Sequence, residues 1–178
     1  VMCDGAEAAD YRVEAFAGYH AARDPMPDRL APQFGKGPAL WSALGWNPTH
    51  SDRFEADDLM ATLARQEASR GASCRILTAD RDLLQCADDR VRILLLKPGK
   101  DLLDCGPAEV ERMFGVAPER IPDLIALRGD PSDGIPGAPG VGAKKAEALL
   151  GEYGSLEGVI AAADEQTPKL SASLRDNA

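Results

Sequence analysis

The sequence contains no long hydrophobic run, no excess of positive charge and few side chains that bind soft metals. No apolar segment approaches the length needed to span a membrane, and the first residues, VMCDG, lack the basic and apolar regions of a signal peptide. The four cysteines form no CxxC pair, and only His20 and His50 are available to complete a zinc site. We therefore expect a soluble cytosolic protein with reduced, buried thiols.

The charge balance is acidic, with 29 Asp and Glu against 20 Lys and Arg and a formal net charge of -9. Nucleic-acid-binding proteins usually carry a basic excess, so the balance taken alone argues against a nucleic-acid partner. The acids, however, recur in tight groups, formed by Asp4, Glu55, Asp57, Asp58, Asp80, Asp82, Asp130 and Asp133. The remaining acids nearly balance the bases. If the acidic groups hold cations, the charge balance no longer argues against a nucleic-acid partner.

The chain of 178 residues, 44% hydrophobic, is long enough for one core with a small appended lobe. Helical spacing of apolar residues predicts a helix over 54–71, which ends on a glycine suited to a C-cap. Short β-branched and apolar runs predict strands at 74–80 and 91–96, with a short helix between them. This order predicts an α/β layer with a mostly parallel sheet over 1–105, and helices and turns alone over 106–178.

Four shorter segments complete this prediction. The apolar pair before Cys3 and Asp4 is typical of a strand end. The Pro- and Gly-rich segment 23–37 indicates an irregular surface region that faces a substrate. Trp41 and Trp46 are expected to pack in the core or between helices, and the polar tail from Thr167 onward is expected to be frayed.

The acidic groups predict a metal site. Asp80 and Asp82 directly follow a predicted strand, and Asp4 ends another, so the three should meet at the carboxyl edge of a parallel sheet. Glu55 and Asp58 share a helix face, with Asp57 beside them. Oxygen ligands without His or Cys suit Mg²⁺ or Mn²⁺, and a cluster of this size suits two ions that hydrolyse a phosphodiester. The simpler alternatives are first-turn acids that complement a helix dipole and, for GDPSDG, a surface turn.

A second pattern, PGAPGVGAKKAEALL, is a glycine-rich turn that leads into a helix beginning near Ala143. Backbone N–H groups from Val141 to Ala143 are expected to face outward and bind an anion, as in a helix-hairpin-helix that grips a nucleic-acid backbone. The alternative is a tight turn with ordinary exposed lysines. A second basic and aromatic group lies near the proline-rich segment and could contact phosphates or stack on a base. The candidate DNA contacts are Arg12, Tyr19, His20, Arg23, Gly140, Val141, Gly142, Lys144 and Lys145.

In several ordered stretches the chain resembles the bacterial 5′ exonuclease/flap endonuclease family, which includes the N-terminal nuclease domain of bacterial DNA polymerase I. These stretches are YHAARDPMPDRLAPQ, FEADDLMATLA, ILTADRDLLQ, FGVAPERIPDLIALRGDPSDGIPGAPGVGAKKAEALL and YGSLEGV. The resemblance implies a PIN-like α/β nuclease fold, a helical arch over the active site and a helix-hairpin-helix lobe that holds duplex DNA. It also places Arg12, Tyr19 and Arg23 near the arch, where they steer the 5′ strand.

Carried over by position, the resemblance places Asp4, Glu55 and Asp57 at a first metal site and Asp80, Asp82 and Asp133 at a second, with Asp58 and Asp130 as additional acids. It implies two Mg²⁺ or Mn²⁺ ions, with K⁺ at the hairpin lobe. The implied partners are DNA with 5′ flaps, ends or nicks, RNA in RNA–DNA hybrids, and a DNA polymerase in the same chain or in trans. The implied location is the bacterial cytosol and nucleoid, with no membrane partner.

The sequence departs from the family pattern in ways that keep other functions open. The first strand of the family, which carries another aspartate, has no counterpart here, and neither do the helices that usually follow the hairpin lobe. His20 replaces a usual lysine and Lys145 a usual threonine. The main hypothesis is a structure-specific 5′ nuclease in replication and repair. The alternatives are a DNA-binding module with little catalysis and a phosphate-ester hydrolase of the haloacid type, for which only Asp80-Arg81-Asp82 has the required form.

Overall fold

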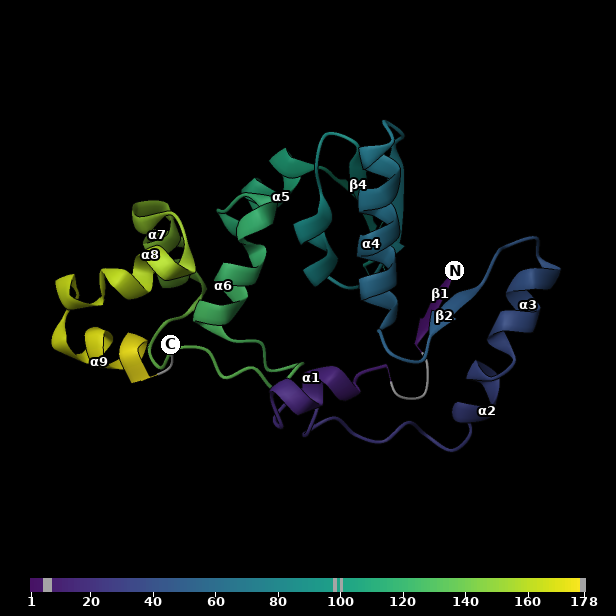
Figure 1. The fold of residues 1–178 in the computed structure, drawn as a ribbon, viewed down its shortest axis with the longest axis horizontal. Helices are drawn as coiled ribbons and strands as arrows, with labels where there is room; N and C mark the ends of the chain where they lie inside the picture. Colours follow the sequence, from purple (N-terminus) through teal and green to yellow (C-terminus); the bar gives the residue numbers. More distant parts are fainter. Residues whose placement is uncertain (5–7, 98, 100, 177–178) are drawn as a thin grey trace. The chain divides into compact units, whose positions relative to one another are not determined.

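The chain folds into two compact units, Val1–Leu63 and Ala64–Ala178. The computed structural model describes residues 1–4, 8–97, 99 and 101–176, and Figure 1 follows the chain through them. The boundary between the units falls inside α4 (Ala56–Ser69). Within the described residues, no helix is both long and apolar enough to cross a membrane.

The first unit contains a pair of short parallel strands, β1 (Met2–Asp4) and β2 (Thr49–Ser51). Their register pairs Cys3 with His50 and Asp4 with Ser51, so the predicted strand end at Asp4 is confirmed. Parallel strands need a long crossover connection. Its helices are α1 (Asp10–Ala15), α2 (Ala31–Phe34) and α3 (Gly37–Ala43). The predicted surface segment 23–37 is almost entirely exposed, and α2 adds one helical turn within it.

The two tryptophans lie at the surface of this unit, so the prediction that they pack in the core or between helices is wrong. Trp41 is 37% exposed and Trp46 60%, and the neighbouring Leu40 and Leu44 are 57% and 61% exposed. Among the described residues of Val1–Leu63, Ala8 is the one buried hydrophobic side chain. Trp41 lies in α3 and Trp46 follows it, and no described segment covers these apolar side chains.

The second unit contains a mixed sheet with strand order β3 (Cys74–Thr78), β4 (Val91–Leu95) and β5 (Leu103–Cys105). β3 and β4 are parallel, and β5 runs antiparallel to β4. Alternate residues of β4 point into the core, because successive side chains of a strand face opposite sides. Val91, Ile93 and Leu95 are each at most 1% exposed, so β4 is the centre of this core.

Helices complete the second unit: after β5, every named element of the described chain is an α-helix or a 3₁₀ turn. They are α5 (Pro107–Phe114), α6 (Ile121–Arg128), α7 (Ala143–Tyr153), α8 (Leu156–Ala161) and α9 (Pro168–Asp176), with 3₁₀ turns η1 (Asp82–Cys86), η2 (Pro118–Arg120) and η3 (Ala163–Glu165). The helix predicted over 54–71 is α4, and Gly71 follows it with a left-handed φ of 84°. The predicted α/β class with an all-helical C-terminal part is confirmed.

The C-terminal tail is ordered, so the prediction of a frayed end is wrong over α9. Leu170 and Leu174, four residues apart on one helix face, are 5% and 3% exposed. The Ser173 hydroxyl donates to the Pro139 carbonyl oxygen at 2.8 Å and ties the helix to the glycine-rich hairpin. A polar sequence with two buried leucines is thus enough for a docked helix.

All four cysteines are free, as expected for a reduced protein. Cys105 is fully buried, whereas Cys3, Cys74 and Cys86 are partly exposed, so the expected burial holds for one thiol. Burial raises the pKa of the Cys105 thiol, and the Glu109 carboxylate adds to this effect. Cys105 therefore behaves as a core side chain at neutral pH.

Candidate active site

The first acidic group lies where β1 ends and α4 begins. The Ala56 N–H donates to Asp4 Oδ1 at 2.7 Å, and the Glu55 N–H donates to Asp58 Oδ2 at 3.0 Å. The first N–H groups of a helix lack partners within the helix, so these carboxylates satisfy them and complement the helix dipole. The acids of EADD therefore do stabilise the start of a helix, as the simpler alternative predicted. This role does not exclude metal binding by the same carboxylates.

Arg12 holds two of these carboxylates together. Its guanidinium forms an ion pair with Glu55 and a second, at 3.0 Å, with Asp58 Oδ1. Two tyrosines add hydroxyl groups: Tyr11 donates to Asp58 Oδ2 at 2.8 Å and Tyr19 donates to Glu55 Oε2 at 3.0 Å. A cation and two donors thus neutralise part of the acidic group within the first unit.

The four residues predicted as the basic and aromatic group do lie together. The Tyr19 and His20 rings stack with centroids 3.9 Å apart, and Arg23 Nη1 lies 3.4 Å from His20 Nδ1. His20 has a left-handed φ of 54°, which is uncommon for a residue other than glycine. Arg12 lies near the Tyr19 ring, with the guanidinium 5.7 Å from its centroid. Contact of this group with DNA stays a prediction.

Sequence reasoning missed Tyr11 in this group. Burial, followed by the hydrogen bond to Asp58, raises the pKa of its hydroxyl to about 12. The hydroxyl therefore stays protonated and remains a donor to the carboxylate. The available signal was its position beside Arg12, which did not identify a partner 47 residues away.

The second acidic group lies in the second unit and brings together Asp80, Asp82, Asp130 and Asp133. Burial is the largest cause, and the charges of the other three carboxylates the next, of a rise in the pKa of Asp82 to about 6, against which Arg128 acts. Carboxylates act on one another in this way only when they are close in space. The structure therefore brings two acids next to β3 together with two acids of the loop after α6.

Local hydrogen bonds fix the backbone around these carboxylates. Asp80 Oδ1 accepts from the Asp82 N–H at 2.8 Å, and Asp130 Oδ1 accepts from the Ser132 N–H at 2.9 Å and from the Ser132 hydroxyl. Burial acts to raise the pKa of Asp130, but the bonds from Ser132 outweigh it and the pKa lies below its ordinary value. Asp130 is therefore ionised at neutral pH, and its charge bears on Asp82.

The loop that carries Asp130 and Asp133 is closed at its base by glycines. Asp130 and Ile135 exchange both backbone hydrogen bonds at 2.8 Å. Gly129 and Gly137 have φ of 80° and 63°, and a Cβ built on Gly137 would lie 2.2 Å from the Gly129 nitrogen. Only glycine allows the two backbone segments to approach this closely. The glycines of GDPSDGIPG thus hold the carboxylates at a fixed place after α6.

The hairpin before α7 matches the prediction in part. Gly142 is the N-cap of α7, and Lys144 and Lys145 are exposed in its first turn. Val141, however, is 4% exposed and its N–H donates to the Ala138 carbonyl at 3.0 Å. The expectation that the Val141 N–H faces outward is therefore wrong, because the hairpin uses this donor to close its own turn. Gly140 has φ 83°, and a Cβ built on it would meet no other atom within 4 Å, so this part of the hairpin is open to a ligand.

The donor chemistry of both acidic groups fits hard divalent cations, since the candidate ligands are all carboxylate oxygens. Among the described residues, no three His, Cys, Asp or Glu side chains are arranged to hold a metal ion. The excess of negative charge around Asp82, which Arg128 offsets only in part, nevertheless favours a cation at this position. The predicted ligands therefore have the donor atoms that a hard divalent cation prefers. In the described part of the chain they do not form a complete coordination shell.

Comparison with known proteins decides the family. Residues 1–115 match the description "5′-3′ exonuclease, N-terminal resolvase-like domain", and residues 116–178 match "5′-3′ exonuclease, C-terminal SAM fold". The chain belongs to the 5′-3′ exonuclease family. Membership removes the haloacid-type hydrolase from consideration.

Curated relatives of this family member are DNA polymerases. The chain is 39% identical over 168 residues to DNA polymerase I of Mycobacterium tuberculosis, covering 94% of this chain and 19% of that protein. It is 41% identical over 175 residues to the thermostable DNA polymerase I of Thermus thermophilus, covering 98% of this chain and 21% of that protein. The chain therefore spans about a fifth of the length of these relatives.

Solved structures support the same fold. A T5 5′-exonuclease with bound zinc ions aligns with a TM-score of 0.80 at 21% identity, covering 98% of this chain and 67% of that one. The catalytic core of Rad2 in complex with DNA substrate aligns with a TM-score of 0.60 at 15% identity, covering 99% of this chain and 57% of that one. The predicted nuclease fold of the 5′-3′ exonuclease family is thus confirmed.

Proposed function

We propose that the chain is a structure-specific 5′ nuclease that hydrolyses phosphodiesters of DNA with divalent metal ions. The observation that carries the proposal is the crowding of Asp80, Asp130 and Asp133 around Asp82, whose pKa is raised to about 6 by burial and then by these three charges. A site that concentrates negative charge, so that one carboxyl keeps its proton to a higher pH than usual, is built to receive cations. Membership of the 5′-3′ exonuclease family supports the reaction type.

The proposed ligands are the acids of the two groups. Asp4, Glu55 and Asp57, with Asp58, form one set, and Asp80, Asp82 and Asp133, with Asp130, form the other. Mg²⁺ or Mn²⁺ would supply an activated water and stabilise the leaving oxygen. The protein holds these acids through the helix-start bonds of α4 and the glycine-closed loop after α6. K⁺ is proposed for the hairpin before α7.

The proposed domain roles follow the sequence division, with residues 1–105 as nuclease core and 106–178 as the DNA-binding lobe. The proposed substrates are 5′ flaps, ends and nicks in DNA, together with RNA in RNA–DNA hybrids. Contacts are assigned to the stacked group of Tyr19 and His20 and to Lys144 and Lys145. The DNA polymerase I relatives support action beside a polymerase, in the same chain or in trans, in the bacterial cytosol and nucleoid.

A second candidate function is a DNA-binding module of the same fold with little catalysis. The observation that favours it is the hold of Arg12 on Glu55 and Asp58, because a guanidinium already neutralises two proposed metal ligands. DNA binding that persists in EDTA without any metal-dependent product would support this candidate.

The test is cleavage of an end-labelled 5′-flap duplex in Mg²⁺, Mn²⁺ or EDTA, resolved on a denaturing gel. We expect metal-dependent cuts near the junction, and a loss of at least about 100-fold in rate for Asp80→Asn, since a lost metal ligand removes several kcal/mol of transition-state stabilisation. Asp89→Asn removes the same charge from an exposed position and should cut like the wild type. Equal rates for the two variants, or cuts in EDTA, would exclude the proposed site.

A further inference from the structure

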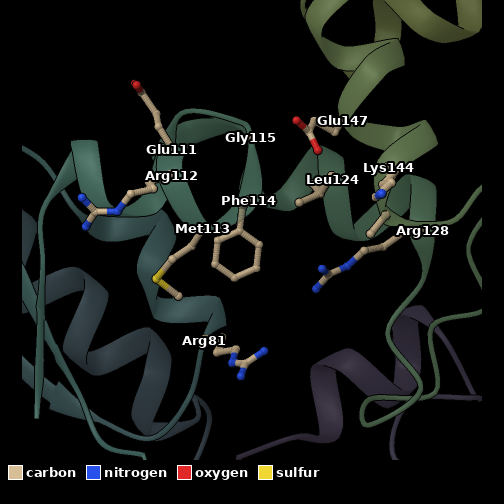
Figure 2. Close-up of a pocket in the computed structure, with 11 residues that line it drawn as sticks. Arg81, Glu111, Arg112, Met113, Phe114, Gly115, Leu124, Arg128, Lys144 and Glu147 are labelled. Carbon is tan, nitrogen blue, oxygen red and sulfur yellow. The ribbon is translucent and has the colours of Figure 1, made fainter. Parts of the chain in front are cut away.

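The second unit contains a pocket that the proposed acidic site does not use. It has a volume of about 490 Å³ and lies among the start of η1, the end of α5, α6 and the start of α7. Figure 2 shows the Phe114 ring near its centre, with Met113 and Leu124 beside the ring. One wall of the pocket is therefore apolar and contains an aromatic ring.

Three cations from three separate elements line the same pocket. They are Arg81, next to η1, Arg128, the last residue of α6, and Lys144, in the first turn of α7. In Figure 2 the Arg81 and Arg128 guanidinium groups extend toward the space beside Phe114. Within the described part of the chain, none of the three forms an ion pair. Cations that converge without a carboxylate in direct contact, in a chain of net charge -9, indicate a site for an anion.

The other charged residues of the pocket are already engaged or point elsewhere. Arg112 Nη2 lies 3.7 Å from Glu109 Oε1, and its side chain extends away from Phe114, as does that of Glu111. The Glu147 side chain lies against Gly115, where a Cβ would come within 2.1 Å of the Glu147 Cδ. These acids therefore leave the space between Arg81, Arg128 and Phe114 to a ligand.

The pocket also adjoins the second acidic group. Arg128 acts on Asp82 and on Asp130, because its charge lowers the pKa of both carboxyls. Arg81 stands between Asp80 and Asp82 in the chain. An anion bound by these two guanidinium groups would therefore lie beside the carboxylates that are proposed to hold metal ions.

We propose that this pocket binds one nucleotide, with its phosphate held by Arg81, Arg128 and Lys144 and its sugar and base against Phe114. Arginine binds phosphate through two parallel N–H donors, and an aromatic face accepts a base of any sequence. The Arg128 guanidinium already lies 5.8 Å from the centroid of the Phe114 ring, which sets charge and ring side by side. The nucleotide is either a unit of the DNA strand next to the scissile bond or a released nucleoside 5′-monophosphate. This inference rests on the proposed nuclease function.

The test measures binding in EDTA, so that no cleavage is required. Fluorescence anisotropy of a labelled 5′-flap duplex and calorimetric titration with thymidine 5′-monophosphate are compared for the wild type, Arg128→Gln and Arg128→Lys. We expect Arg128→Gln to weaken about tenfold the affinity for whichever of the two ligands occupies the pocket. Arg128→Lys should recover part of this loss, because it keeps the positive charge. If the ligand is the DNA strand, the slope of log affinity against log salt should also fall by about 1 in Arg128→Gln.

Arg70→Gln is the matched control, because it removes one positive charge from an exposed residue directly after α4, whose ion-pair partner among the described residues is Glu67. If duplex affinity falls in Arg128→Gln and thymidine monophosphate does not compete with the duplex, the pocket binds the DNA strand. If thymidine monophosphate competes with the duplex, and this competition is lost in Arg128→Gln, the pocket binds the released nucleotide. Wild-type binding of both ligands by Arg128→Gln, or an equal loss in Arg70→Gln, would overturn the inference. Because the flap-cleavage test uses Asp80→Asn and metal, either proposal can fail while the other stands.

Discussion

At the scale of single residues, Asp82 carries the clearest physical signature of the candidate site. Its pKa lies near 6 instead of the ordinary 3.8, because the carboxyl is partly buried and three other carboxylates surround it. Between these two values the folded chain binds more protons at Asp82 than the unfolded chain does. The contribution of Asp82 to the free energy of unfolding therefore decreases as the pH rises from 4 toward 7.

This sign gives a prediction for the metal-free protein. In EDTA at pH 7, Asp82→Asn should raise the free energy of unfolding by an amount on the order of 1 kcal/mol, after allowance for solvent screening of a partly exposed group. The two proteins should converge below about pH 3, where the carboxyl is protonated in both the folded and the unfolded state. Thermal melting across this pH range measures the difference. A variant that melts below the wild type at pH 7 would contradict the charge crowding, and Asp89→Asn serves as the control for a lost exposed charge.

At the scale of elements, the loop between α6 and α7 depends on the contact of Gly129 with Gly137. Gly137→Ala should lower the free energy of unfolding by about 2 kcal/mol or more, because the new methyl group meets backbone atoms and the φ of 63° is unfavourable for alanine. Gly140→Ala is the matched control, since Gly140 has φ 83° but open space around it. It should cost about 1 kcal/mol for the backbone conformation alone.

Urea denaturation of the two variants measures this difference, and flap cleavage shows whether the loop also positions its acids. The Gly137 variant should lose cleavage together with stability, because Asp130 and Asp133 move with the loop. Equal destabilisation of the two variants would mean that the loop relaxes around the methyl group and that the close contact is not required.

Elements with strong periodicity were predictable from the sequence, and elements stabilised by distant partners were not. The apolar spacing of α4 and the β-branched run of β4 identify them directly. β5 has only three residues and exists because β4 offers an edge for it. The polar segment of α9 becomes a helix because it docks through Leu170 and Leu174.

The candidate site shows the same division. The motifs TADRD and GDPSDG mark Asp80, Asp82, Asp130 and Asp133 as unusual, and the structure brings these four together. The hold of Arg12 on Glu55 and Asp58 joins residues more than 40 positions apart, and no local pattern announces it. The pocket around Phe114 likewise depends on how three helices meet, so neither Arg128 nor Phe114 was identified in advance.

At the scale of the whole molecule, buried apolar side chains are unevenly distributed between the two units. Apart from Ala8, every buried hydrophobic residue of the described chain belongs to Ala64–Ala178. Most of the exposed large hydrophobic residues, including both tryptophans, belong to Val1–Leu63. The second unit therefore contains the main source of hydrophobic stabilisation, and its backbone should be the better protected against hydrogen exchange.

Tryptophan fluorescence tests this distribution directly. Trp41 and Trp46 are the two tryptophans of the chain, and both have substantial solvent exposure. The native emission should lie close to that of indole in water, respond to iodide quenching and shift little on unfolding. A strongly blue-shifted native spectrum that iodide does not quench would show that this face is covered in solution. Far-ultraviolet circular dichroism, which follows the helices, provides the control that unfolding has occurred.

The contact between Gly129 and Gly137 also bears on how the sequence can change over evolutionary time. The chain leaves the end of α6 at Gly129 and returns to it at Gly137, so the residues between the two glycines form a closed loop. Insertions or deletions inside it need not move α6 or α7, since the backbone contact at its base fixes both ends. Length variation in homologues is therefore expected between residues 131 and 134 and not at the glycines, so that the reach of Asp133 can be adjusted while Asp130, bonded to Ile135, and the two helices stay in place.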